Sequence, residues 1–283
     1  MTGWMTHRDR RWFLIWITGL LILLAWNLLF LNRPAMLRVW SGFGNTLMIT
    51  VVSLCTATLL SVSFSLIMTL TRWNHHRWIF TMLDLILGTL RSVPQIIGLL
   101  LGFIILTLLI QADWLTSPTL ILTGMGLTVG LVMFHEFTDM LNDRIAAFEQ
   151  TDFVHASRVA GVPDRVLILI EIWWRNSRPH LINKLISGTG LTIFLLCSID
   201  FVLSVGLSQT VSAVNFPPTL GSMLAHIDSK QDILSIGVLL SDPTYFWPMI
   251  TRHLQGLSVA FLITFTLVCW FRIGNGYSGR HHL

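Results

Sequence analysis

Residues 152–163 read DFVHASRVAGVP and lie within a polar region, 138–180, of an otherwise strongly apolar sequence. A typical soluble domain has about 25% charged residues. Here only 11% of the 283 residues are charged and 53% are hydrophobic, so the chain cannot cover itself with a polar surface. The contrast between 138–180 and its surroundings indicates an integral membrane protein in which this segment lies outside the bilayer, on the side opposite a second predicted segment, 207–253.

Six apolar runs surround this polar region. Each is long enough to cross a hydrocarbon core of about 30 Å, which takes about 20 helical residues. They predict an all-α membrane protein with about six transmembrane helices in a single domain, 1–283, whose first apolar run is retained as a span. The predicted spans are 12–31, 44–70, 82–110, 118–137, 181–206 and 254–271.

The basic residues fall in short clusters between the spans. HRDRR at 7–11 precedes the first span, TRWNHHRW at 71–78 follows the second, and five arginines lie in 138–180. An excess of Lys and Arg marks cytoplasmic loops. The pattern predicts that both termini and 138–180 are cytoplasmic. It also argues against a nucleic-acid partner, despite the net charge of +4, because the basic residues form no single patch.

Cysteine and histidine positions give no sign of a cofactor or metal site. The three cysteines, Cys55, Cys197 and Cys269, lie inside apolar runs and lack CxxC spacing. Most of the ten histidines fall in predicted loops rather than in facing spans, where a bis-His haem would need them. We expect no catalytic residue, cofactor or metal in this chain.

The quoted stretch has the pattern of a short helix followed by a corner. Asp152 is expected to cap a helix that begins at Phe153, because a carboxylate accepts hydrogen bonds from the free amides of a first turn. Ala156 and Ser157 are small and would let a partner approach closely. Gly161 suits the left-handed conformation that ends a helix.

A second short helix is predicted to begin with Pro163 in its first turn. A polar region of this length, with capped helices of its own, favours a docking surface, although a passive connection stays open. Charges within the third span, 82–110, raise a similar choice. Asp84 and Arg91 either pair near the cytoplasmic interface or line a pathway at a kink made by Pro94.

The sequence resembles the permease subunits of bacterial ABC importers in three places. DFVHASRVAGVPDRVLILIEIWW, from residue 152, is similar to the conserved cytoplasmic loop of the peptide/nickel class. FVLSVGL at 201–207 and PPTLGSML at 217–224 are similar to the two segments that follow this loop in the family. The resemblance covers the C-terminal half of the chain in order. The matching loop positions are Asp152, Phe153, Val154, Ala156, Arg158 and Gly161, with Ser157 in place of an alanine.

This resemblance implies a type I ABC importer permease fold in the bacterial inner membrane. The chain would be a pore subunit for peptides or a related small solute such as nickel or a metallophore. The seven loop residues would form the coupling helix that docks on an ATPase. The implied partners are a second homologous permease subunit, two ABC ATPase subunits that bind ATP and Mg, an extracytoplasmic substrate-binding protein and membrane lipids.

The sequence departs from the family in three respects. Trp173 and Trp174 stand where the family has Leu-Pro. The acidic residue usual in the fifth span falls at Ile199, with Asp200 one position away. About a dozen residues replace the family's long outer segment before the second span.

Three further expectations concern the subunit interface, ATP binding and alternative functions. Small residues in the fifth span, including Gly188 and Gly190, would let a second permease pack closely. The chain has no phosphate-binding GxxxxGK[ST] motif, as expected if ATP binds to a partner. A secondary transporter or a membrane scaffold without transport activity stays the alternative.

Overall fold

The computed structural model describes residues 7–204, 216–225, 234–235, 237–252 and 254–278, and all regular structure in these ranges is helical. Five helices are long and apolar enough to cross a membrane, and the bent pair α3–α4 makes a sixth if it is counted as one span. The prediction of an all-α chain with about six membrane helices is confirmed at this level. The five long helices are α1 (His7–Phe30), α2 (Arg33–Trp73), α5 (Pro118–Glu149), α8 (Arg178–Ser204) and α13 (Leu254–Ser278).

Shorter helices connect these long ones. The bent pair consists of α3 (Arg77–Ser92) and α4 (Gln95–Gln111). The polar region contains α6 (Asp152–Val159), α7 (Asp164–Val166) and a π-helix (Leu167–Asn176). Further along the chain lie α10 (Leu220–Ala225), a 3-10 turn (Pro243–Tyr245) and α12 (Phe246–Arg252).

α2 begins earlier than predicted. Residues 33–43, which were expected to form an outer loop, belong instead to the helix, which starts at Arg33. Asn32 caps it by accepting a hydrogen bond of 3.0 Å from the Ala35 amide, and Pro34 fits the first turn, where a missing N–H costs nothing. At 41 residues, α2 is about 60 Å long.

The predicted third span is broken into two helices. α3 and α4 meet at an angle of 93°. Val93 between them is extended, with φ −86° and ψ 123°, as expected for a residue that precedes a proline. The kink predicted at Pro94 is therefore present, but as a right-angle corner rather than a bend within one continuous helix.

The polar region between spans is shorter than the sequence indicated. α5 continues to Glu149, well past the predicted end at 137, and α8 begins at Arg178. The part outside the long helices therefore shrinks to 150–177. Residues 205–206 of the predicted fifth span, and 207–215, 226–233, 236 and 253 of the predicted outer segment 207–253, lie outside the described residues.

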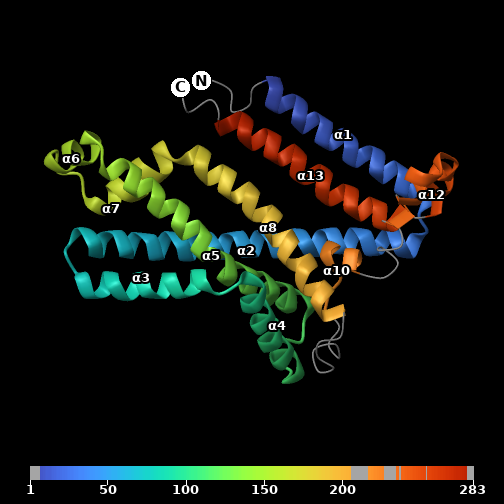
Figure 1. Ribbon diagram of the computed structural model, residues 1–283, viewed down its shortest axis with the longest axis horizontal. Coiled ribbons are helices and arrows are strands. Elements are labelled where there is room, and N and C mark those ends of the chain that lie inside the picture. The colour runs from blue at the N-terminus through green and yellow to red at the C-terminus, as the bar shows by residue number, and fades with distance from the viewer. Residues whose placement is uncertain (1–6, 205–215, 226–233, 236, 253, 279–283) are drawn as a thin grey trace.

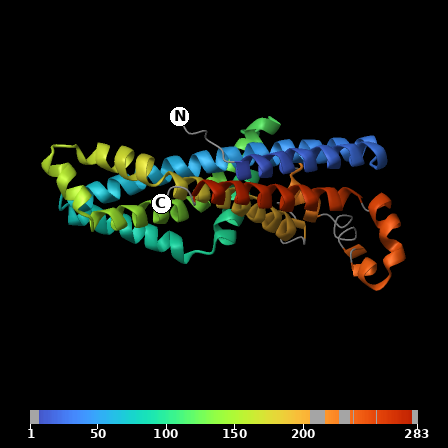
Figure 2. The same cartoon turned by 90° about the horizontal axis from the view of Figure 1, so that it is seen from above.

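α2 and α5 form the most extensive helix–helix contact, and the main core lies between them, α4 and α8. Glycines permit this closeness. A Cβ at Gly130 would lie 2.7 Å from the Ser53 carbonyl oxygen of α2. α1 and α13 lie side by side along the outside of this core in both views (Figures 1 and 2). α6 and the α2–α3 turn share one end of the molecule, and α12 lies at the other (Figure 1).

Candidate functional site

The corner after α6 has the backbone conformation that the sequence predicts. Gly161 has φ of +80°, in the left-handed region that side chains with a Cβ rarely adopt. The Gly161 amide donates to the Arg158 carbonyl at 2.9 Å, and the Val162 amide donates to the Ser157 carbonyl at 3.1 Å. These bonds close the C-terminal end of α6 and turn the chain toward α7.

The start of α6 differs from the prediction. Asp152 is the first helical residue, and Thr151 occupies the N-cap position with extended backbone and no side-chain cap bond. The Thr151 hydroxyl donates instead to the Phe148 carbonyl at 2.6 Å. The Asp152 carboxylate still lies in the first turn, where the helix dipole stabilises a negative charge. Similarly, Pro163 precedes α7, which begins at Asp164.

α6 has one buried side and one exposed side. Val154 is 1% exposed and packs into a cluster formed by the ends of α5 and the π-helix. Val159 is 90% exposed, and Ala156 on the same helix face is also exposed. Phe153 is 39% exposed and its ring contacts Phe148 of α5. A short apolar surface therefore faces outward from an element fixed on its inner side.

Arg158 fixes the corner from within the chain. Its Nε donates to the Asp164 carboxylate at 2.9 Å, and its guanidinium lies 3.9 Å from the centre of the Trp73 ring. The sequence predicted Arg158 at a surface that meets a partner, whereas here both of its contacts are internal. Ser157 beside it is partly buried.

Trp73, at the end of α2, joins this corner to α5. Its indole N–H donates to the Glu149 carboxylate, and Arg72 pairs with the same carboxylate at 2.6 Å. Neither Trp73 nor Glu149 was predicted from the sequence. Trp73 follows the predicted end of the second span, but Glu149 lies well past the predicted end of the fourth span at 137, so no sequence signal pointed to this pair. α2, α5, α6 and α7 are thus linked at one end of the molecule.

The π-helix packs beneath α6. Leu167, Ile168 and Ile172 are fully buried, and Trp173 is 3% exposed. Trp174 is exposed, and the Arg178 guanidinium lies 4.6 Å from the centre of its ring. π-helical turns are rare and occur frequently at functional sites. Trp173 and Trp174 both lie within the π-helix, so the helical path continues through them.

A second set of polar side chains holds the α3–α4 corner against α5. Arg91 forms an ion pair with Asp139, and Gln95 donates to Glu136 at 2.6 Å. Lys184 of α8 pairs with the same Glu136 carboxylate at 2.8 Å. Both sides of the Pro94 corner are therefore anchored to one helix. The sequence did not identify Asp139, Glu136 and Lys184 as partners, because the three lie on elements whose packing no local pattern specifies.

Asp84 takes no part in these pairs. It is exposed on α3 and forms no ion pair with any described residue. Of the two charges predicted to pair or to line a pathway, Arg91 pairs and Asp84 does not. An open pocket of about 450 Å³ adjoins the pairs. It is lined by Glu136, Asp139, Met140, Asp143, Arg144, His180 and Lys184.

The two glycines predicted to serve a subunit interface contact helices of their own chain. A Cβ at Gly188 would lie 2.8 Å from Leu54 of α2 and from the Phe137 ring of α5. One at Gly190 would lie 3.6 Å from Leu267 of α13. Gly188 thus serves packing within the chain, and the interface role of both residues stays a prediction.

Asp200 helps to hold a short buried helix in place. Its carboxylate accepts a hydrogen bond of 3.1 Å from the Thr219 hydroxyl, just before α10. Thr219 and Ser222 exchange two further bonds of 2.9 Å that cap this helix. Gly221 permits the contact, because a Cβ there would lie 2.8 Å from the Cys197 backbone nitrogen of α8. The part of the PPTLGSML segment from Thr219 onward is therefore largely buried against α2 and α8, whereas Pro218 is exposed.

Among the described residues, no three His, Cys, Asp or Glu side chains are grouped so that they could hold a metal ion. No protein-family model matches this sequence, and no curated protein matches it. The α6 corner and the α3–α4 corner are the two places where the described residues form a candidate functional geometry.

Proposed function

We propose that this chain is a pore-forming subunit of an ATP-driven, binding-protein-dependent importer in the bacterial cytoplasmic membrane, with a type I ABC importer permease fold. The observation that supports this proposal is the α6 corner. A short helix presents an exposed apolar face at Ala156 and Val159, and its other face is fixed to the ends of two long membrane helices. This is the geometry that a docking element needs to transmit force.

The mechanism follows from these attachments. The exposed face of α6 would dock in a cleft of an ATPase subunit that binds and hydrolyses ATP. Because Arg158 ties α6 to Asp164 and Trp73, a displacement of α6 would move the ends of α2 and α5 with it. α5 also holds the α3–α4 corner through Asp139 and Glu136. Motion at α6 would therefore reach the broken span.

The cargo and the remaining partners follow from the family resemblance alone. A second homologous permease would complete the pore, a second ATPase would complete the motor, and an extracytoplasmic binding protein would deliver a peptide or a small solute such as nickel or a metallophore. Selectivity would lie largely in that binding protein.

A site-specific cross-link tests the docking step. A photo-crosslinking amino acid is placed at Val159, and at Trp114 as a matched control, because Trp114 is also highly exposed but lies in the α4–α5 connection. After irradiation of cells, Val159 should capture a protein that contains a phosphate-binding GxxxxGK[ST] motif, and Trp114 should not. Equal capture by both positions, or capture of no ATPase at Val159, would reject the proposal.

The α3–α4 corner favours a second candidate, a secondary transporter. Such transporters use broken helices and charged side chains at their binding sites, and the corner here adjoins the Arg91–Asp139 and Lys184–Glu136 pairs. The two candidates differ in one assay. Proteoliposomes that contain only this chain should show no uptake driven by a proton or sodium gradient if ATPase subunits power the pore.

A further inference from the structure

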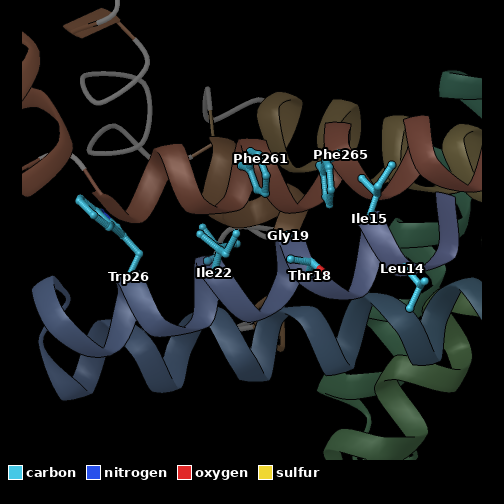
Figure 3. A pocket seen from close by; sticks show the side chains of 9 residues that line it. Leu14, Ile15, Thr18, Gly19, Ile22, Trp26, Phe261 and Phe265 are labelled. Carbon is cyan, nitrogen blue, oxygen red and sulfur yellow. The ribbon is translucent and has the colours of Figure 1, made fainter. Parts of the chain in front are cut away.

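An apolar groove of about 770 Å³ runs between α1 and α13 on the outside of the helix bundle. Leu14, Ile15 and Ile22 of α1 line it and are each about half exposed, and Phe261 of α13 lines the opposite wall. Figure 3 shows Ile15 and Ile22 pointing toward α13, and Phe261 pointing toward α1, with Phe265 beside Gly19. A Cβ at Gly19 would collide with the Phe265 ring. The absence of a side chain at Gly19 therefore lets the Phe265 ring pack against α1 at the floor of the groove.

The two helices run antiparallel in a defined register. The Arg272 guanidinium lies 5.6 Å from the centre of the Trp12 ring, and the Trp16 indole donates to Thr266 at 3.3 Å. Near the other end, Ser258 donates to Asn27 at 2.7 Å. The first turns of α1 therefore lie beside the last turns of α13.

One end of the groove is basic. Arg10 and Arg11 come one helical turn before Leu14 and Ile15, and therefore lie on the same face of α1. Arg272 reaches the same end from α13 through its contact with Trp12. All three arginines are exposed, and none forms an ion pair within the part of the chain that the structure describes.

The other end of the groove is closed by aromatic rings. Trp26 lies beside Phe30, with ring centres 4.6 Å apart, and meets Trp247 edge to face at 6.4 Å. From Leu14 to Trp26 the groove is about 18 Å long, close to half of a hydrocarbon core about 30 Å thick. It is therefore as deep as one leaflet of a bilayer.

We propose that this groove binds an acyl chain of an anionic phospholipid, whose phosphate lies against Arg10, Arg11 and Arg272. The apolar walls match a hydrocarbon chain, and the three exposed arginines match a negative headgroup at the level where a leaflet presents it. A transmembrane helix of another subunit would match the walls equally well. It would not account for the exposed arginines gathered at one end of the groove.

Native mass spectrometry of the purified full-length chain tests this proposal. The chain is mixed with equal amounts of phosphatidylglycerol and phosphatidylcholine that have identical acyl chains, and the bound lipids are counted. We expect a preference for phosphatidylglycerol. This preference should fall about fivefold for each arginine removed in R10Q/R11Q. It should be retained in R10K/R11K and in the control R33Q/R38Q, which removes the same charge from exposed arginines at the start of α2.

A second pair of variants tests the groove itself. Thr18→Trp should fill it and reduce binding of both lipids, whereas Thr264→Trp, at an exposed position of α13 outside the groove, should not. The proposal fails if the unaltered chain binds both lipids equally, or if R33Q/R38Q acts like R10Q/R11Q. It also fails if Thr18→Trp leaves the lipids bound and instead separates a dimer, since a second copy of the chain would then be the occupant.

Discussion

Gly161 is the residue whose backbone conformation turns the chain at the α6 corner. Its φ of +80° is unfavourable for a residue with a Cβ, yet an added Cβ would meet no atom within 4 Å. A substitution there is therefore opposed by backbone conformation alone, without a steric clash against neighbouring elements. Substitutions at Gly161 can therefore be compared for their effect on the backbone conformation alone.

We expect Gly161→Val to destabilise the corner by about 1–2 kcal/mol, because the left-handed conformation crowds a Cβ against the backbone. Gly161→Asn is the control, since Asn tolerates this conformation far better. Hydrogen exchange of the Gly161 and Val162 amides, or of residue 161 after substitution, measures the effect. Exchange in the Val variant should rise about 5- to 30-fold. Equal exchange in the Val and Asn variants would mean that the corner does not depend on φ.

The sequence predicted the left-handed conformation of Gly161 but not the contacts of the Arg158 side chain. A left-handed turn is a local property, so the pattern around Gly161 is sufficient to indicate it. The contact of Arg158 with Trp73 joins residues that are distant in the sequence. No local pattern specifies such a contact, and the Arg158 side chain was therefore expected on the outer surface.

At the scale of the elements, the corner between α3 and α4 has two independent causes. Pro94 disfavours the helical conformation at Val93. In addition, Arg91 and Gln95, one on each side of the corner, are bound to Asp139 and Glu136 of α5. The proline is visible in the sequence, whereas the two anchors need the packing of α3 and α4 on α5.

We expect the corner to persist in Pro94→Ala, because both anchors remain. Spin labels at Met82 and Leu108 should stay about 28 Å apart, as for two arms at a right angle, rather than about 39 Å, as for a straight helix. Electron paramagnetic resonance measures this distance. Adding D139N and E136Q should broaden or lengthen it. A distance as long as that of the straight helix in Pro94→Ala alone would show that the proline is the sole cause.

Helix ends were the least predictable feature of the elements. The sequence predicted about six long apolar helices, since hydropathy reports the contact of a helix with lipid. α5, however, continues to Glu149 in polar sequence, because Leu141 and Ile145 pack against the π-helix. Hydropathy does not report packing of this kind outside the bilayer, so the polar region appeared longer than it is.

At the scale of the whole molecule, the positive-inside rule predicts that the α6 end faces the cytoplasm. In a chain without its three native cysteines, a cysteine introduced by Trp114→Cys should react with a membrane-impermeant thiol reagent in intact cells. One introduced by Val159→Cys should react only after the cells are permeabilised. Both positions are highly exposed, so accessibility within the chain is matched. The opposite labelling would reverse the orientation and remove the basis for docking on a cytoplasmic ATPase.

The length of α2 has a consequence for how the molecule responds to its solvent. At about 60 Å the helix is twice as long as a hydrocarbon core is thick, so a substantial part of it must stand in water even when it is tilted. The apolar cluster beneath α6, which includes Leu167 and Ile172, packs against this part of α2. It is held together by water exclusion, as in a soluble protein, whereas the spans are held by contacts in lipid. Urea and cold, which weaken burial from water, should therefore loosen the α6 end while the spans stay intact.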